Sequence, residues 1–278
     1  MFAQTFFIVW RESIEALLVV GVLHAWLMHH PAGRGAMRYL WGGVLAGLGG
    51  AIALSFVLMR FGAMLPPEGQ DYFQAGLILI AALLIVQMVF WMRRHGRAIK
   101  QRLEEQLADH LRNGRLWGIF FLAQIAVMRE GAEAVIFLQG SIAASQGTGS
   151  DIAAGIVVAL AAAGFAYIIL QLGGRYLSWR VFFFLTELML LFLACALFVT
   201  GTGYLVSFGL LPYLDPLWDT SLLLNDMSRV GGVIANLTGY RAVPDGVTVS
   251  TWILYWSAIA IGYRVQTRRI HDLQKEVA

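Results

Sequence analysis

Two stretches of the sequence place the same pattern of ionisable residues inside apolar segments. An arginine, a glutamate and, three residues later, a second glutamate occur in VWRESIEALL and again 118 residues further on in VMREGAEAVIFL. The six residues are Arg11, Glu12, Glu15, Arg129, Glu130 and Glu133. Because residues three and four apart share one face of a helix, each motif presents two carboxylates and one guanidinium together.

The charge of these six residues indicates a cation. Each ionised group at the centre of a membrane helix costs roughly 2.5–3.5 kcal/mol, so such groups are expected to pair and to be functional. Two arginines balance two of the four glutamates and leave a formal charge of −2. Close carboxylates repel one another when ionised, so the empty site is expected to hold protons that a multivalent cation replaces. Oxygen donors suit a hard metal ion, and no cysteine or methionine cluster argues for a soft one.

Three other interpretations of the motifs are open. Arg–Glu pairs that only lock two helices together would explain one glutamate per arginine but not the second. An intramembrane glutamate-dependent enzyme is disfavoured because the sequence has no His-Glu-x-x-His motif and no histidine in the middle of an apolar segment. A transporter of another hard cation such as manganese would use the same carboxylates.

The elements that carry the motifs are predicted to be membrane helices. The 278 residues are 59% hydrophobic and only 13% charged, against about a quarter charged in soluble domains. A helix needs roughly 20 apolar residues to cross the bilayer. Seven stretches meet this length, so we predict an all-α polytopic membrane protein with spans at residues 3–28, 39–60, 72–92, 116–142, 152–173, 180–206 and 247–264.

The basic residues predict the orientation of these spans. With the N-terminus outside, the inner segments hold 15 of the 20 Lys and Arg residues and the outer loops hold three, which favours an N-out, C-in topology. Three helices per unit make the fourth helix antiparallel to the first. A single transmembrane domain is therefore expected, with inverted repeats at 1–92 and 116–206, a cytoplasmic amphipathic linker at 93–115, an outer loop at 207–246, a last helix at 247–264 and a cytoplasmic tail at 265–278.

Two of the connecting segments have helical patterns of their own. Leucine and isoleucine recur on one stripe of the linker, which predicts a basic amphipathic helix on the cytoplasmic surface. In the outer loop, NDMSRVGGVIANLTGY is apolar enough to pack back onto the bundle as a short helix.

Further polar residues are weaker candidates for the ion path. Glu187 is a lone carboxylate in an apolar run and is a candidate for the path or a proton relay. Gln87 and Gln124 either line the path or make interhelical hydrogen bonds. The acidic residues that could receive the ion outside are Asp215, Asp219 and Asp226.

The doubled Arg-Glu-x-x-Glu motif resembles that of the high-affinity iron permease family, which includes fungal oxidase-dependent iron transporters and a bacterial EfeU-like branch. MVFWMRR and NDMSRVGGVIANLTGY are similar to the bacterial branch. The resemblance implies a non-enzymatic, multi-pass permease of the inner (plasma) membrane, with iron as transported substrate and no fixed cofactor.

The resemblance also implies roles for particular residues and partners. The four motif glutamates would bind iron beside two essential arginines. The iron would be ferric, oxidised by a partner, and a periplasmic iron-binding or oxidase protein would be associated. The lipid bilayer would be the other partner, with no nucleic acid. The acidic motif in the outer loop of the fungal members has no clear match here.

Overall fold

The long helices of the chain lie where the apolar segments predict them. The computed structural model describes residues 2–30, 33–95, 99–112, 116–144, 149–173 and 179–276. Within these ranges the chain forms nine helices, and the one β contact is an isolated bridge between Pro216 and Asp245. The all-α prediction is therefore confirmed. The seven long helices are α1 (Phe2–His29), α2 (Gly33–Met64), α3 (Pro67–His95), α5 (Leu116–Ala144), α6 (Gly149–Gly173), α7 (Trp179–Ser207) and α9 (Gly246–Glu276).

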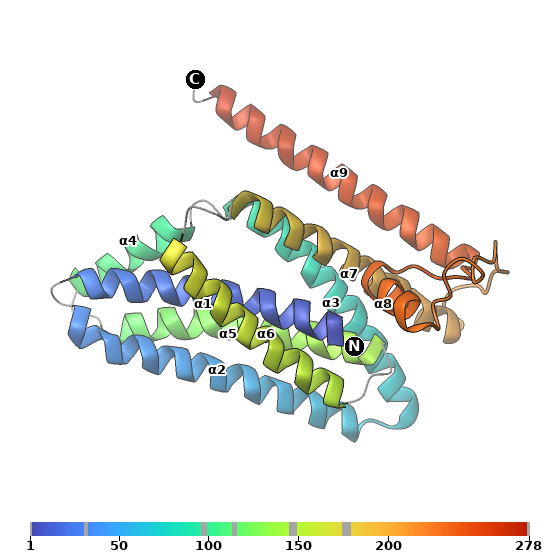
Figure 1. Ribbon diagram of the computed structural model, residues 1–278, viewed down its shortest axis with the longest axis horizontal. Coiled ribbons are helices and arrows are strands. Elements are labelled where there is room, and N and C mark those ends of the chain that lie inside the picture. The colour runs from blue at the N-terminus through green and yellow to red at the C-terminus, as the bar shows by residue number, and fades with distance from the viewer. Residues whose placement is uncertain are drawn as a thin grey trace.

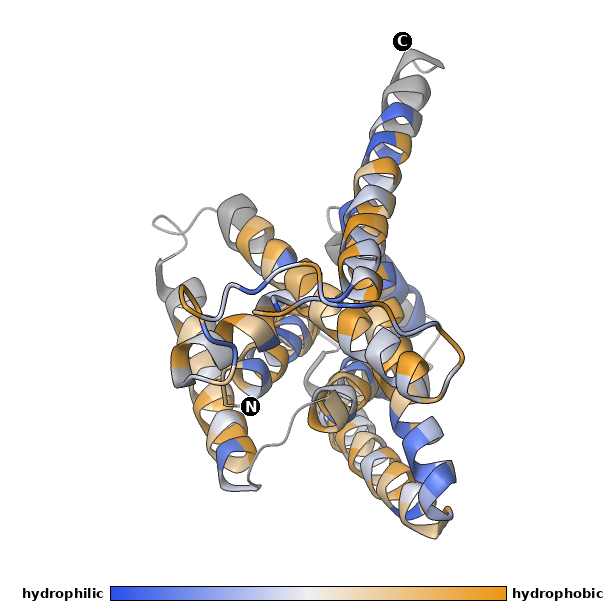
Figure 2. Ribbon diagram, turned by 90° about the vertical axis from the view of Figure 1, so that its right-hand side faces the viewer, coloured by the Kyte–Doolittle hydropathy of each residue, from blue (hydrophilic) through white to orange (hydrophobic). Residues whose placement is uncertain are grey.

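Four of these helices are long and apolar enough to cross a membrane by composition alone. They lie in α2, α3, α6 and α7, at Gly35–Met64, Pro67–Arg93, Gly149–Ile168 and Phe184–Ser207. Their outer faces expose large apolar side chains such as Leu45, Ile52 and Phe56 on α2, as expected for a surface that meets lipid. Figure 2 shows apolar residues running along the long helices. The count of seven spans and the N-out orientation stay predictions.

The helices of the two halves pack in an exchanged arrangement. In Figure 1, α1 runs from the labelled N-terminus toward α4 (Ile99–Arg112), whereas α5 begins beside α4 and runs back, so the two helices are antiparallel. The first helix of each half packs against the second helix of the other, α1 on α6 and α5 on α2, and α1 also contacts α5. The exchange is the same for both halves, as an inverted repeat allows, and the contact of α1 with α5 brings the two motifs to one crossing point.

Close approach of α2 and α5 depends on small residues. A Cβ atom added at Gly47 would lie 2.8 Å from the carbonyl oxygen of Gln124 and 3.0 Å from the amide nitrogen of Met128. The backbones of the two helices therefore touch here, as small residues allow in membrane bundles. This contact fixes the position of α5 one turn before its motif.

The two short helices close the ends of the bundle. Leu107 of α4 is fully buried among side chains that include Leu23 and Ile119, so the predicted linker helix packs onto α1 and α5. At the other end, α8 (Arg229–Thr238) packs on α7, and the Gln4 side chain of α1 donates a hydrogen bond to the Asn236 carbonyl oxygen at 2.6 Å. The prediction that this segment folds back as a short helix is confirmed.

Candidate metal centre

Three carboxylates converge where α1 crosses α5. Glu12 comes from α1, and Glu130 and Glu133 come from α5. One carboxylate oxygen of each residue lies within 4.8 Å of the other two, an arrangement that can hold a metal ion. Only 2% of Glu12 and 9% of Glu130 is exposed. The antiparallel crossing thus joins one motif to the other, as the sequence predicts.

Each of the three converging carboxylates has one buried oxygen without a hydrogen-bond partner among the described residues. The Oε2 atoms of Glu12, Glu130 and Glu133 are buried, and no described residue hydrogen-bonds to them. Buried polar atoms are nearly always paired, because an unpaired one loses its hydration without compensation. Three unpartnered acceptors on three converging carboxylates therefore point to a positively charged occupant, either protons or a cation.

The first motif arginine is buried and holds both glutamates of its own helix. The guanidinium of Arg11 lies with Nη1 2.7 Å from Glu12 Oε1, and its Nη2 pairs with Glu15 Oε1. Arg11 is 5% exposed. Glu15 lies outside the group of three converging carboxylates and is held by Arg11 instead. The structure therefore brings together three of the four predicted glutamates. The fourth, Glu15, is linked to them through Arg11, which contacts both Glu15 and Glu12.

The second motif arginine has a different environment. Arg129 Nε lies 3.0 Å from Glu133 Oε1 and 3.9 Å from Glu130 Oε1, and 41% of its side chain is exposed. Its guanidinium lies over the ring of Trp91 from α3, 4.1 Å from the ring centre. The two arginines occupy equivalent places in the sequence motif, but only Arg11 is enclosed.

Two methionines beside the motif were not found by sequence reasoning. Arg11 Nη1 donates a hydrogen bond to Met88 Sδ at 2.8 Å, and Nη2 donates to Met92 Sδ at 2.8 Å. The sequence shows no methionine cluster at the motif, and the structure adds these two sulfurs beside Arg11, whereas the three converging ligand atoms are all carboxylate oxygens. Met88 and Met92 lie more than 75 positions from Arg11 in the chain, so no local pattern connects them. The sequence held two signals for them, since they lie four residues apart on an apolar helix and both belong to the MVFWMRR stretch that resembles the bacterial branch.

Comparisons with known proteins identify the family of the chain. The profile of the iron permease FTR1 family matches residues 1–266. The chain belongs to this family. Among its relatives in the iron permease FTR1 family is the "Ferrous iron permease EfeU" of Shigella sonnei, 29% identical over 266 residues that cover 95% of both chains. The protein of the same name from Escherichia coli O6:H1 is 30% identical over 253 residues, covering 90% of this chain and 91% of that one. No solved structure matches the chain.

The remaining predicted path residues of this permease lie apart from the three carboxylates. Glu187 Oε1 lies 3.0 Å from Arg93 Nε of α3 and accepts a hydrogen bond from the Tyr263 hydroxyl of α9 at 2.6 Å. Glu187, which stands alone in its apolar segment of the sequence, is therefore one member of a cluster that connects α3, α7 and α9. Gln87 is exposed, and Gln124 is half-buried against α2.

The outer acidic residues do not converge. Asp219 Oδ1 accepts hydrogen bonds from the backbone nitrogen and the hydroxyl of Ser221, at 2.8 and 2.5 Å, and these bonds lower the pKa of Asp219. Asp226 Oδ2 accepts a bond from the Ala242 nitrogen at 3.4 Å, and Asp215 is exposed. Within the described ranges, these residues form no group of three converging ligands, and two of them hold local backbone in place.

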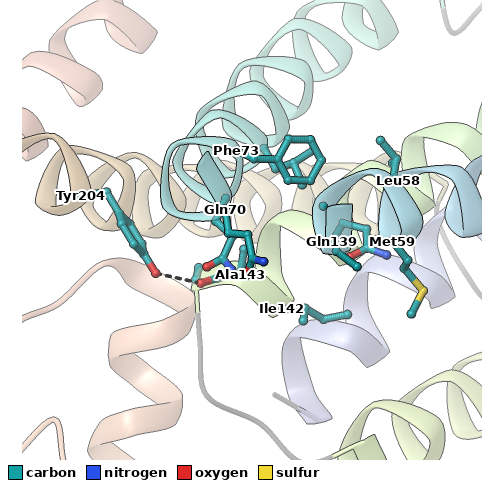
Figure 3. Close-up of a pocket in the computed structure, with 13 residues that line it drawn as sticks. Leu58, Met59, Gln70, Phe73, Gln139, Ile142, Ala143 and Tyr204 are labelled. Atoms are coloured by element: carbon teal, nitrogen blue, oxygen red, sulfur yellow. Dashed lines mark hydrogen bonds between the residues drawn. The ribbon is translucent and has the colours of Figure 1, made fainter. Parts of the chain in front are cut away.

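A cavity with a mixed polar and apolar lining opens at the helix ends opposite α4. Its volume is about 640 Å³, and its lining includes Gln70 and Gln74 of α3, Gln139 of α5 and Tyr204 of α7. Figure 3 shows Gln70 and Gln139 beside it and the hydrogen bond from the Tyr204 hydroxyl to the Ala143 carbonyl oxygen, 3.3 Å long. Under the predicted topology this end of the bundle faces outward.

Proposed function

We propose that this protein carries iron across the inner membrane from the periplasm to the cytoplasm, with iron as its transported substrate. The observation that carries the proposal is the group formed by Glu12, Glu130 and Glu133, whose ligand oxygens lie within 4.8 Å of one another on two antiparallel helices. A group of this kind offers an ion three carboxylates at once, and it draws on both halves of the chain. Membership of the iron permease FTR1 family supports iron as the ion.

We further propose that the ion is ferrous. The relatives from Shigella sonnei and Escherichia coli are both named ferrous iron permeases. Ferrous iron also fits a site with thioether sulfur beside it better than the ferric ion expected from the resemblance, because softer donors favour softer ions. The oxidase partner expected with ferric iron is then unnecessary. A periplasmic iron-binding partner could deliver the ion to the outer loop, where Asp215 and Asp219 are exposed.

In this scheme the arginines supply charge balance rather than ligands. Arg11 pairs with Glu12 and Glu15, and Arg129 pairs with Glu133. A divalent ion that enters would neutralise the two unbalanced negative charges of the six-residue group. We propose that the ion arrives through the glutamine-lined cavity and is passed along the carboxylates, with protons returning to them after release.

The test is ion uptake by the purified full-length chain in liposomes. Ferrous iron kept reduced with ascorbate, ferric citrate and manganese should be offered separately. We expect uptake of ferrous iron by the wild type and its loss in Glu130→Gln and Glu133→Gln, which keep side-chain shape but remove the charge. Glu68→Gln, which removes an exposed carboxylate from the first turn of α3, is the matched control and should transport normally.

Two results would reject the proposal. Normal ferrous uptake by both glutamine variants would remove the converging carboxylates from the path. Uptake of manganese in clear preference to either form of iron would assign the same carboxylates to a manganese transporter.

A further inference from the structure

The guanidinium of Arg11 occupies a cradle of two kinds of acceptor, carboxylate oxygen and thioether sulfur. Its Nη1 lies against one carboxylate oxygen, from Glu12, and one sulfur, from Met88. Its Nη2 lies against one carboxylate oxygen, from Glu15, and one sulfur, from Met92. Each terminal nitrogen of the cation is therefore held between an oxygen of α1 and a sulfur of α3.

This arrangement is unusual for a pair of arginine–glutamate contacts. A guanidinium is best satisfied by oxygen acceptors, and thioether sulfur is only a weak acceptor. Two methionines one turn apart on α3 both direct their sulfurs to the same guanidinium, although leucine would fill the space without a polar atom. For a metal ion the same sulfurs are good donors, since thioethers are soft ligands that prefer later transition metals to magnesium, calcium or manganese.

The cradle is continuous with the group of three carboxylates. Glu12 belongs to both, because its Oε1 contacts Arg11 and one of its oxygens lies within 4.8 Å of ligand oxygens from Glu130 and Glu133. Its Oε2 is buried and unpartnered, and the residue is 2% exposed. A free, enclosed oxygen at the junction of the two sets is where a shared ion would bind.

We propose that Glu12, Glu15, Met88 and Met92 form a second ion position, which Arg11 fills in the absence of iron and which selects ferrous iron over manganese through its two sulfurs. The proposal rests on the proposed function, since it assumes that iron reaches Glu12. A guanidinium and a metal ion cannot share the cradle, so Arg11 must turn away when the ion binds. Arg11 therefore acts as a built-in competitor that only an ion with affinity for both oxygen and sulfur displaces well.

The experiment compares the full-length wild type with Met88→Leu/Met92→Leu in liposomes. Leucine keeps the volume and removes the sulfur. The control is Met64→Leu/Met227→Leu, which changes two methionines that are 79% and 93% exposed. Ferrous iron and manganese uptake are measured separately under reducing conditions, and cadmium serves as a soft inhibitor. We expect the preference for ferrous iron over manganese, and the inhibitory potency of cadmium, to fall about tenfold in the first variant and to stay unchanged in the control.

The outcomes separate a ligand from a packing role. If ferrous and manganese uptake fall by the same factor, the methionines only position Arg11 and the inference is wrong. The same conclusion follows if preference and cadmium inhibition are unchanged. Should the variant aggregate, X-ray absorption at the iron edge of the wild type, loaded with ferrous iron without oxygen, provides an independent measurement. Sulfur bound directly to iron supports the proposal, and a shell of oxygen and nitrogen alone overturns it.

The two proposals fail in different ways. A wild type that takes up no ferrous iron would overturn the proposed function and the inference with it. A different result would remove only the second ion position and leave the proposed function standing. In that result ferrous uptake depends on Glu130, but replacing Met88 and Met92 does not change the preference for ferrous iron over manganese.

Discussion

The two motif arginines should differ in their contribution to stability, although the sequence makes them equivalent. Arg11 is 5% exposed and contacts two carboxylates, whereas 41% of the Arg129 side chain is exposed and its close pair is with Glu133 alone. Removing one partner of a buried ion pair leaves an uncompensated charge and costs about 3–5 kcal/mol. An exposed pair contributes about 0.2–1 kcal/mol, and an exposed cation–π contact adds about 0.5–1 kcal/mol.

We therefore expect Arg11→Gln to lower the free energy of unfolding by about 3–5 kcal/mol and Arg129→Gln by about 1–2 kcal/mol. The measurement is reversible unfolding of the full-length protein in mixed micelles, with sodium dodecyl sulfate as denaturant and helicity as the signal. Because protonated carboxylates need no counter-charge, the deficit of Arg11→Gln should shrink as the pH falls.

A second-site variant tests the cause of this loss. Adding Glu15→Gln to Arg11→Gln returns the six-residue group to its formal charge of −2, so part of the lost stability should come back. Glu68→Gln in the same background removes an exposed charge elsewhere and should restore nothing. Equal losses for the two arginine variants, or no recovery in the double variant, would refute the argument that a buried charge balance holds Arg11.

Two further predictions concern the packing around the site. Gly47→Ala places a Cβ atom 2.8 Å from a backbone oxygen of α5 and should cost about 1–3 kcal/mol in the unfolding assay, whereas Gly49→Ala meets no atom within 4 Å and should raise stability by about 0.5–1 kcal/mol. If Gly49→Ala lowered the free energy of unfolding as much as Gly47→Ala, the loss in Gly47→Ala could not be due to the contact between α2 and α5. Arg93→Gln and Glu187→Gln should show a coupling of about 1 kcal/mol in a double-mutant cycle, because their side chains pair at 3.0 Å and are 39% and 19% exposed. Additive losses would contradict this link between α3 and α7.

The fold could be predicted to the extent that hydropathy marks helices. The first predicted segment, 3–28, becomes Phe2–His29, and 180–206 becomes Trp179–Ser207. The last segment differs, since 247–264 is the apolar part of a helix that continues to Glu276. Hydropathy marks where the chain passes from an apolar to a polar environment, whereas a helix ends only where its backbone hydrogen bonds end. The polar residues after Arg264 are good helix formers, so the helix outlasts its apolar stretch.

The doubled motif could predict that the two helices share a site, but not which glutamates converge there. The three- and four-residue spacing shows that Glu12 and Glu15 share a face, but not which of them faces α5 and which is held by Arg11. That choice depends on the crossing of α1 and α5 and on the third helix that contacts the arginine. The sulfurs of Met88 and Met92 come from α3. A single sequence does not show that these residues contact a motif so far away in the chain.

The contacts of α3 bear on the role proposed for the motif arginines. The two motif arginines, one from each half, meet neutral and polarisable groups on this one helix, sulfur for Arg11 and the ring of Trp91 for Arg129. Such partners keep a guanidinium near the carboxylates without cancelling its charge, which the proposed exchange of Arg11 for an ion needs. A carboxylate from α3 would add one more buried pair to those that Arg11 already makes with Glu12 and Glu15, and breaking such pairs is costly. Under the proposed exchange, neutral contacts on one side of Arg11 and carboxylates on the other would keep the charge balance of the site reversible.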